Sequence, residues 1–214
     1  LSHSLIFKGG TCAAMQGYLD RFSVDLDFDL APDTSKTIIK RELGKTFTIL
    51  GLDVKSQSLA TVQYVLKYPN PKGTRNTLQF DAIDFSLSEN TVQPIFLADI
   101  DRYLPCQTIE TMFSHKLVAV LDRYHKHSSI AGRDIYDIYY FFLNNHQYDG
   151  KIIKKRTGLT PKQYLKELAE FIENKITQTI LDEDLNTLLP PEKFRSIRKS
   201  LKAQVLSMLK TTHY

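Results

Sequence analysis

One short stretch alternates strictly between apolar and acidic side chains, and it constrains the fold more than any other feature of the sequence. In residues 24–30 every even-numbered position is Val, Leu or Phe, and every odd-numbered position is Asp. Successive side chains of a β-strand point to opposite faces of the sheet. The pattern therefore predicts a strand whose apolar face covers a core and whose other face carries Asp25, Asp27 and Asp29.

Carboxylates at alternate positions of a strand can share a metal ion. Their Cα atoms lie about 7 Å apart, and their side chains can converge on ions. Mg²⁺ prefers oxygen ligands, and paired ions about 4 Å apart stabilise both oxygens of a phosphoryl transfer. We expect Asp25 and Asp27 to bind metal with Asp81, on a strand expected to pair beside them. Asp29 is interpreted as a supporting or solvated acid. Alternatively, the three acids of residues 24–30 simply face water on a half-buried sheet.

A pair of glycines follows the first apolar run. Leu5 to Phe7 predicts a strand, Gly9 and Gly10 a tight turn, and residues 11–19 a packed helix. Backbone amides at a helix N-terminus favour an anion such as a triphosphate, and the Thr11 hydroxyl can add a donor. A glycine pair by itself is more often only a turn.

The remaining periodicity divides the chain into a mixed α/β part and a helical part. We expect a helix over 35–50, a hairpin of strands 59–68 and 77–86, and an edge strand over 92–97, which contains Pro94. From Ile109 the pattern is helical, with further helices over 134–143, over 160–176 and from 190 onward. The sequence thus predicts an α/β (α+β) fold with a mixed sheet and flanking helices in 1–105 and a helical C-terminal lobe in 106–214.

Composition is that of a folded globular protein, with 42% hydrophobic and 24% charged residues. No apolar run reaches the roughly 20 residues of a membrane span, and the first residues lack the basic region of a signal peptide, so we expect a cytoplasmic protein. The chain begins without Met, and we expect natural sequence to precede Leu1. Cys12 and Cys106 are expected to be free thiols.

Basic residues gather at the end of the chain. Residues 191–214 hold six Lys or Arg and one acid. Such a segment can contact the phosphates of nucleic acid, although a solvated helix face explains it equally simply.

Two groups of residues together resemble a known family. Lys8-Gly9-Gly10-Thr11, followed by Arg21-Phe22-Ser23-Val24-Asp25-Leu26-Asp27-Phe28, resembles the nucleotidyltransferase signature, with Thr11 where the family has Ser. The residue pattern of this motif is similar to that of the AbiEii toxins of type IV toxin-antitoxin systems. Phe113 to Ala119 with Arg123, and then Arg133 to Asp137, resemble later motifs of that family. These matches span residues 5–142.

The resemblance implies a nucleotidyltransferase that moves a nucleoside monophosphate from an NTP to an acceptor hydroxyl with Mg²⁺ or Mn²⁺. It implies a toxin acting on RNA, in particular tRNA, with a cognate antitoxin, and a helical lobe that closes over the nucleotide. Two alternatives remain: transfer to a protein hydroxyl, and a non-catalytic nucleotide-binding or interaction module of the same fold. The implied nucleotide-binding residues are Lys8, Gly9, Gly10, Thr11, Arg21, Ser23, Lys116 and Arg123.

The later motifs add catalytic candidates to Asp25, Asp27 and Asp81. In the family a helical Lys and an Asp are needed for activity, and by position they fall on Lys116 and on Asp134 or Asp137. Lys116 interrupts an apolar stripe, where an ammonium requires water or an anion such as a triphosphate. Alternatively, Lys116 only extends to the surface, and Arg133 forms a structural ion pair with Asp134 or Asp137.

Overall fold

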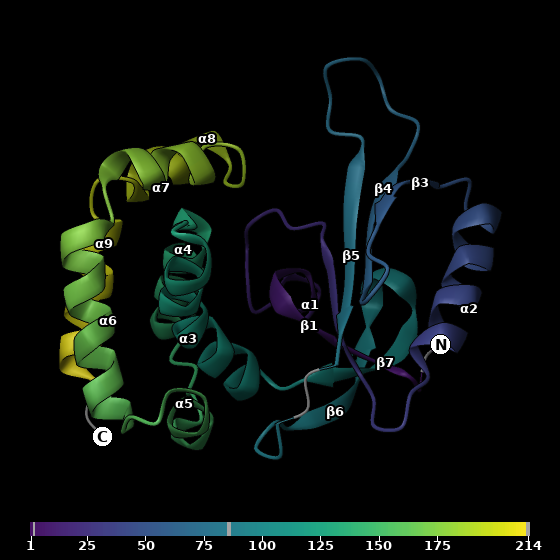
Figure 1. Cartoon of the computed structure of the whole chain (residues 1–214). Coiled ribbons are helices and arrows are strands. Elements are labelled where there is room, and N and C mark those ends of the chain that lie inside the picture. The colour runs from purple at the N-terminus through teal and green to yellow at the C-terminus, as the bar shows by residue number, and fades with distance from the viewer. Residues whose placement is uncertain (2, 85–86, 213–214) are drawn as a thin grey trace. The chain divides into compact units, whose positions relative to one another are not determined.

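The computed structural model describes residues 1, 3–84 and 87–212, and its chain divides into two compact units. One unit comprises residues 1–16 and 23–107 and is built on a sheet, whereas the other comprises residues 17–22 and 108–214 and is helical (Figure 1). No helix in the described part of the chain is both long and apolar enough to cross a membrane. The assignment of a nucleotide-binding core and a closing lobe to residues 1–105 and 106–214 stays a prediction.

The described strands form a seven-stranded mixed sheet in the order β3-β4-β5-β2-β1-β7-β6. β1 (Leu5–Lys8) lies beside β2 (Leu26–Leu30) in antiparallel pairing, and β2 lies beside β5 (Thr77–Ile83) in parallel pairing. The expected partnership between the strand of Asp25 and Asp27 and the strand of Asp81 is therefore confirmed. Residues 85 and 86, the end of the expected strand over 77–86, lie outside the described residues.

The described part of the sheet includes two strands that the sequence patterns did not predict, β3 (Asp53–Gln57) and β7 (Arg102–Gln107). β4 (Val62–Lys67) pairs antiparallel with β5, as the expected hairpin requires, but a further strand, β3 (Asp53–Gln57), pairs with β4. At the other end, β6 (Val92–Leu97) is the edge strand, as Pro94 indicated, and it pairs with β7 (Arg102–Gln107), which also pairs with β1. A short 3-10 helix, η1 (Ala98–Ile100), joins β6 and β7.

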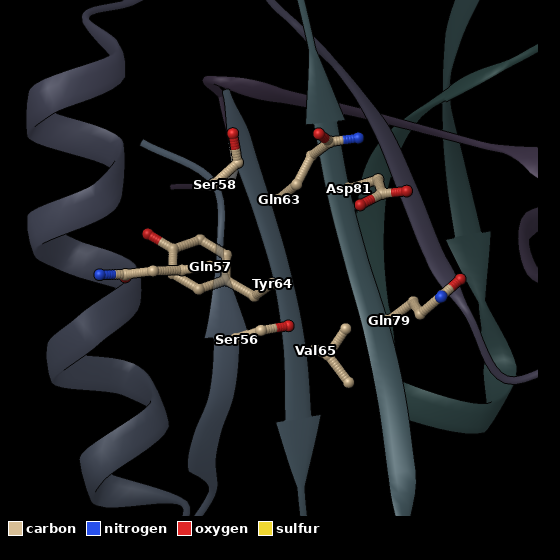
Figure 2. A pocket seen from close by; sticks show the side chains of 8 residues that line it. All are labelled: Ser56, Gln57, Ser58, Gln63, Tyr64, Val65, Gln79 and Asp81. Carbon is tan, nitrogen blue, oxygen red and sulfur yellow. The ribbon is translucent and has the colours of Figure 1, made fainter. Parts of the chain in front are cut away.

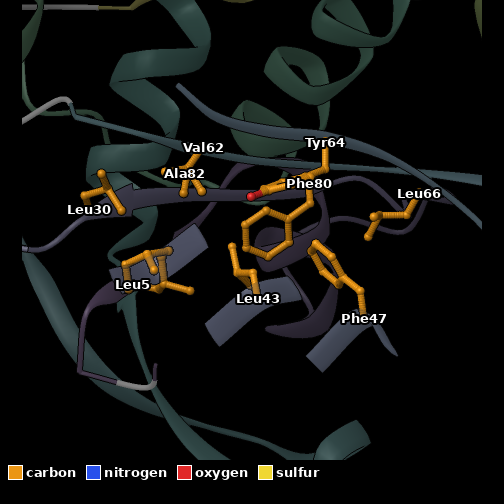
Figure 3. Packing of buried hydrophobic residues seen from close by; sticks show 10 residues of the cluster. Leu5, Leu30, Leu43, Phe47, Val62, Tyr64, Leu66, Phe80 and Ala82 are labelled. Carbon is orange, nitrogen blue, oxygen red and sulfur yellow. The ribbon is translucent and has the colours of Figure 1, made fainter. Parts of the chain in front are cut away.

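The core of the first unit lies between the sheet and α2 (Lys36–Ile49). Ser35 caps this helix by accepting a hydrogen bond from the Ile38 amide. Leu43 and Phe47 pack against the apolar sheet face, which includes Tyr64 and Phe80 (Figure 3). Phe28 stacks between Phe7 and Phe80, with ring centroids 5.0 and 5.1 Å apart. The apolar positions of residues 26–30 thus face the core, and the acidic positions face the opposite side of the sheet.

The glycine pair begins a helix instead of forming a separate turn. α1 (Gly9–Met15) follows β1 directly, so the helix expected over residues 11–19 begins two residues earlier and ends four residues earlier. Gly9 has φ +77°, a conformation that glycine adopts without steric strain. The strand expected from residue 24 begins only at Leu26, so Asp25 lies just before β2.

The helical unit contains the helices that the sequence patterns predicted and three more. α3 (Ile109–His127), capped by Thr108, buries its apolar stripe, and α4 (Gly132–Leu143) packs against it. α6 (Pro161–Lys175) begins with a capping box formed by Thr160 and Gln163. The segment opened by Pro190 holds two helices, α8 (Pro191–Ile197) and α9 (Leu201–Thr211), where one was expected. The further unpredicted helices are α5 (Gly150–Thr157) and α7 (Gln178–Leu185).

Candidate active site

The two proposed metal-binding acids that lie in strands face each other across neighbouring strands. Asp27 of β2 is in register with Asp81 of β5 on one side and with Lys8 of β1 on the other. Paired residues of adjacent strands project to the same face, about 5 Å apart. The sheet therefore presents a row of charged side chains on the face opposite the α2 core.

Gly9 touches the Asp27 carboxylate. A Cβ atom added to Gly9 would lie 2.6 Å from Oδ2 of Asp27, closer than two such atoms can approach. Together with the φ of +77°, this contact requires glycine at the position. The backbone at the start of α1 therefore packs closely against the carboxylate of Asp27.

Thr11 ties the glycine segment to the residues just before β2. Its hydroxyl donates to the Asp25 carbonyl oxygen at 2.5 Å and lies 2.9 Å from Oγ of Ser23. Because the Thr11 hydrogen is used by Asp25, Ser23 is the donor to Thr11. The two hydroxyls, both implied to bind nucleotide, thus fix the position of Asp25 relative to α1.

Asp25 has a partner that the sequence patterns did not predict. Nη2 of Arg75 donates to Oδ1 of Asp25 at 2.7 Å, and both side chains are partly exposed. Arg75 comes from the turn-rich connection between β4 and β5, where a cation carries no pattern that indicates a site. The Asp25 carboxylate is therefore already paired with a cation in this structure.

Asp29 is buried, with a relative exposure of 3%, so the interpretation of Asp29 as a solvated acid is wrong. It accepts hydrogen bonds from the Lys8 ammonium and from Nε2 of Gln107, the latter at 2.7 Å. Burial raises the pKa of Asp29, against the opposing effect of Lys8. Asp29 thus holds the Lys8 ammonium in place by accepting its hydrogen bond. Gln107, which binds Asp29, is a residue of the candidate site that the sequence patterns missed.

The acids on this face repel one another. Burial raises the pKa of Asp81, and the negative charges of Asp27 and Asp25 raise it further. Within the described residues no three His, Cys, Asp or Glu side chains converge as a finished metal site. Asp27 and Asp81 fit a divalent cation as oxygen ligands whose mutual repulsion the cation would relieve, whereas Asp25 would first have to leave Arg75.

The candidates from the later motifs lie together in the helical unit. Nζ of Lys116 on α3 is 2.8 Å from Oδ1 of Asp134 and 3.0 Å from Oδ2 of Asp137, both on α4. Arg123 lies one to two turns further along α3, with its Nε 3.3 Å from Oδ2 of Asp134. The alternative interpretation was a structural ion pair between Arg133 and Asp134 or Asp137. In the described part of the chain both acids instead pair with Lys116, and Asp134 also pairs with Arg123.

Arg21, which the resemblance assigned to nucleotide binding, belongs to the same cluster. Its Nε and Nη2 bind the two oxygens of Asp137 at 2.5 and 2.7 Å. The Asp134 and Asp137 side chains are 2% and 0% exposed, and that of Lys116 is 19% exposed. Two buried carboxylates are thus surrounded by three cations.

The ion pairs of the cluster favour the charged forms of Lys116 and Asp134. Burial opposes the charge of Lys116, but the carboxylates of Asp134 and Asp137 outweigh it and raise the Lys116 pKa. Burial likewise opposes the charge of Asp134, but Lys116 and Arg123 lower its pKa. Lys116 is therefore positively charged at neutral pH, and part of its side chain is exposed.

The sequence matches the family of AbiEii nucleotidyl transferase toxins of type IV toxin-antitoxin systems over residues 1–207. The chain belongs to the AbiEii family. It is accordingly a nucleotidyltransferase of a toxin family, as the two sequence motifs indicated. No curated protein matches the chain.

Three solved structures, two of them described as a nucleotidyltransferase or as nucleotidyltransferase-like, share the AbiEii chain's fold. JHP933 from Helicobacter pylori is 18% identical with a TM-score of 0.57, and the match covers 97% of this chain and 82% of that one. MenT4, a nucleotidyltransferase toxin from Mycobacterium tuberculosis, is 16% identical with a TM-score of 0.53 and coverage of 99% and 77%. An antigenic nucleotidyltransferase-like protein from Paracoccidioides brasiliensis is 17% identical with a TM-score of 0.51 and coverage of 86% and 84%. At these identities the likeness concerns the fold.

Proposed function

We propose that the protein transfers a nucleoside monophosphate from an NTP to a hydroxyl of RNA, with tRNA as the acceptor, at the site formed by Gly9, Asp27 and Asp81. The observation that carries the proposal is the contact between the Gly9 backbone and the Asp27 carboxylate, with Asp81 in register beside Asp27. Backbone amides next to clustered carboxylates suit a polyphosphate with its divalent cation.

The site residues divide the work of this reaction. Backbone amides of Gly9, Gly10 and Thr11 and the Lys8 ammonium bind the phosphates, and Asp29 keeps Lys8 in place. Asp25, Asp27 and Asp81 hold Mg²⁺ or Mn²⁺, which would neutralise charge on the phosphates and on the attacking and leaving oxygens. Asp25 takes this role once Arg75 releases it.

The transfer itself is a displacement at the α-phosphorus. The acceptor oxygen forms a bond to that phosphorus, the bond to the bridging oxygen of the β-phosphate breaks, and pyrophosphate leaves. The proton of the acceptor hydroxyl passes to Asp81, which lies in register beside Asp27. Asp81 therefore both aligns the hydroxyl and accepts its proton.

The assignments in the helical unit rest on the family resemblance. Lys116 and Arg123 are proposed to bind nucleotide, and Asp134 and Asp137 are proposed to be needed for activity because they hold Lys116 charged. The buried Arg21 is engaged with Asp137, so its proposed contribution to nucleotide binding comes through the cluster. Ser23 likewise contributes through its hydrogen bond to Thr11.

RNA is favoured as the acceptor by the basic C-terminal segment and by the family's toxin character, which also supports a cognate antitoxin as partner. Within the described part of that segment, Arg195, Lys199 and Lys210 are exposed and form no ion pair. These three cations are the ones proposed to contact RNA phosphates.

Incubation of the protein with each labelled NTP, Mg²⁺, tRNA and cell-extract protein tests the proposal. We expect label in the tRNA band of a denaturing gel, and none with the Asp27→Asn variant. Label on protein with unlabelled tRNA under every NTP would refute the RNA acceptor and leave nucleotidyl transfer standing. Transfer by Asp27→Asn at the wild-type rate would refute the proposed site.

A further inference from the structure

A polar hollow lies on the sheet surface next to Asp81. It has a volume of about 220 Å³ and is lined by residues of β3, β4 and β5, together with Ser58. Figure 2 shows Gln63 and Asp81 side by side on neighbouring strands, with Gln79 and Val65 further along the same strands. The register explains this arrangement, because Gln63 is opposite Asp81 and Val65 is opposite Gln79.

The chemistry of the hollow suits a neutral, flat ligand with hydrogen-bonding edges. Among the described residues that line it there is no Lys or Arg, and Asp81 repels a phosphate. The Gln79 side chain is exposed and makes no hydrogen bond to a described residue, while Gln63 accepts from the Thr61 hydroxyl at 2.6 Å and keeps its amide donors. Carboxamides offer paired donors and acceptors, which match the edge of a nucleobase. Val65 supplies an apolar surface between them.

The position of the hollow assigns it to the acceptor and not to the NTP. In the strand order β4-β5-β2-β1, Asp81 lies between the hollow and Asp27, and the Gly9 segment follows β1 on the far side. Attacking and leaving oxygens lie on opposite sides of the reacting phosphorus. If pyrophosphate leaves on the Gly9 side, then the acceptor hydroxyl arrives on the Asp81 side, beside the hollow.

We infer that this hollow binds the unpaired 3′-terminal nucleobase of an RNA acceptor through Gln63 and Gln79, and so places the terminal hydroxyl at Asp81. The inference rests on the proposed nucleotidyl transfer and adds to it the place where the acceptor base binds and the two residues that recognise it. Bases of single strands present their edges freely, whereas those in a duplex are paired and stacked. An acceptor with a blunt duplex end is therefore a poor substrate.

The inference is tested by a double-mutant cycle in which one change is made in the protein and the other in the RNA. Wild type, Gln79→Leu and Gln63→Leu are assayed with a short single-stranded RNA and with the same RNA carrying an abasic 3′-terminal nucleotide. Gln93→Leu is the matched control, because Gln93 is an exposed glutamine on the edge strand β6 of the same sheet. KM is measured for acceptor and for NTP with Mg²⁺, and RNA binding is measured by fluorescence anisotropy without NTP.

Gln79→Leu is expected to raise the KM for RNA and to weaken RNA binding by about 5- to 100-fold, the usual worth of a bidentate base contact. The KM for NTP stays unchanged, and Gln93→Leu behaves as wild type. The abasic RNA shows a loss at least as large with wild type, and Gln79→Leu causes no further loss with the abasic RNA, because the contact that it removes is already absent.

Three results overturn the inference. The first is that the losses caused by Gln79→Leu and by the abasic nucleotide multiply when the two are combined. The second is that Gln79→Leu raises the KM for NTP and not the KM for RNA, and the third is that label is transferred to protein with the same dependence on Gln79. Failure of the proposed function is recognised separately, since wild type would then transfer no nucleotide. In that case the RNA affinities measured by anisotropy still test base binding in the hollow. Losses of affinity that do not multiply support it, and unchanged RNA binding by Gln79→Leu refutes it.

Discussion

Arg21 binds both oxygens of the Asp137 carboxylate, although 116 positions separate the two residues in the chain. Asp137 is fully buried, and Arg21 is 7% exposed. The planar guanidinium fits a carboxylate through two parallel bonds, which an ammonium cannot reproduce.

We therefore expect Arg21→Lys to lower the free energy of unfolding by about 1.5–3 kcal/mol, the contribution of one hydrogen bond to a charged group. Chemical denaturation followed by circular dichroism measures it. Arg102→Lys is the control, since Arg102 is exposed and pairs only with its neighbour Asp101, so less than about 0.5 kcal/mol is expected there. Equal losses of unfolding free energy in the two variants would show that the buried pair contributes no more to stability than the exposed one.

Asp134 is expected to make the free energy of unfolding depend on pH in the acidic range. Its pKa in the folded protein is lowered, because Lys116 and Arg123 outweigh the effect of burial. Its carboxylate therefore stabilises the fold above the unfolded pKa of about 3.9, and the contribution disappears as the pH falls through the folded value. The free energy of unfolding, measured from pH 7 to pH 3, is expected to fall more steeply for wild type than for Asp134→Asn. Parallel curves would contradict this assignment.

Asp27→Asn and Asp25→Asn are each expected to abolish nucleotidyl transfer without unfolding the protein. Their melting temperatures should differ, because Asp27 repels Asp81 whereas Asp25 is paired with Arg75. Asp27→Asn relieves the repulsion and should melt at or above the wild-type temperature, and Asp25→Asn slightly below it. Asp53→Asn, on the exposed strand β3, is the control with full activity. Measured transfer at wild-type rates by either site variant would exclude that acid from the metal site.

Lys116→Met should weaken NTP binding and also lower stability. Removal of one partner from a buried ion pair costs about 3–5 kcal/mol, and here the loss should be smaller because Arg123 and Arg21 still pair with the acids. Calorimetric titration with NTP under folded conditions measures binding. Lys126→Met, on the same helix with an exposed side chain, should bind as wild type. A folded Lys116→Met that binds NTP with wild-type affinity would remove Lys116 from the nucleotide site.

The basic C-terminal segment has two kinds of cation, which can be separated by mutation. Lys202 donates to the carbonyl oxygens of Glu173 and Ile176 at 2.8 and 2.7 Å, so Lys202→Ala should lower stability. The combined Arg195→Ala, Lys199→Ala and Lys210→Ala variant should instead weaken tRNA binding and reduce the slope of log affinity against log salt by up to about three. An unchanged slope in that variant would place the RNA contacts elsewhere.

The parts of the fold that sequence could predict are those with a local pattern. Alternation over residues 24–30 identified β2 and the shared side of its acids, and the motifs identified Gly9 and Thr11. β3 was missed because all its residues are exposed, so no apolar alternation marks it. β7 was missed although it lies inside the sheet, because Pro105 interrupts a short run that begins with exposed residues.

The partners of the site residues were beyond sequence reasoning for another reason. Arg75 with Asp25, and Gln107 with Asp29, meet only after distant strands and connections have taken their places. Nothing in the local residue pattern distinguishes these two side chains from the other Arg and Gln residues of the chain. The roles of the acids and of Lys116 stay predictions that the variants above decide.

Residues 17–22 belong to the helical unit, although the chain before and after them belongs to the sheet unit. The chain consequently passes from one unit to the other three times, after residues 16, 22 and 107. A fragment that starts at residue 108 would lack Arg21 and leave Asp137 to Lys116 alone. Neither unit can be cut out at a single position, so a single crossover between related genes would not exchange either unit whole.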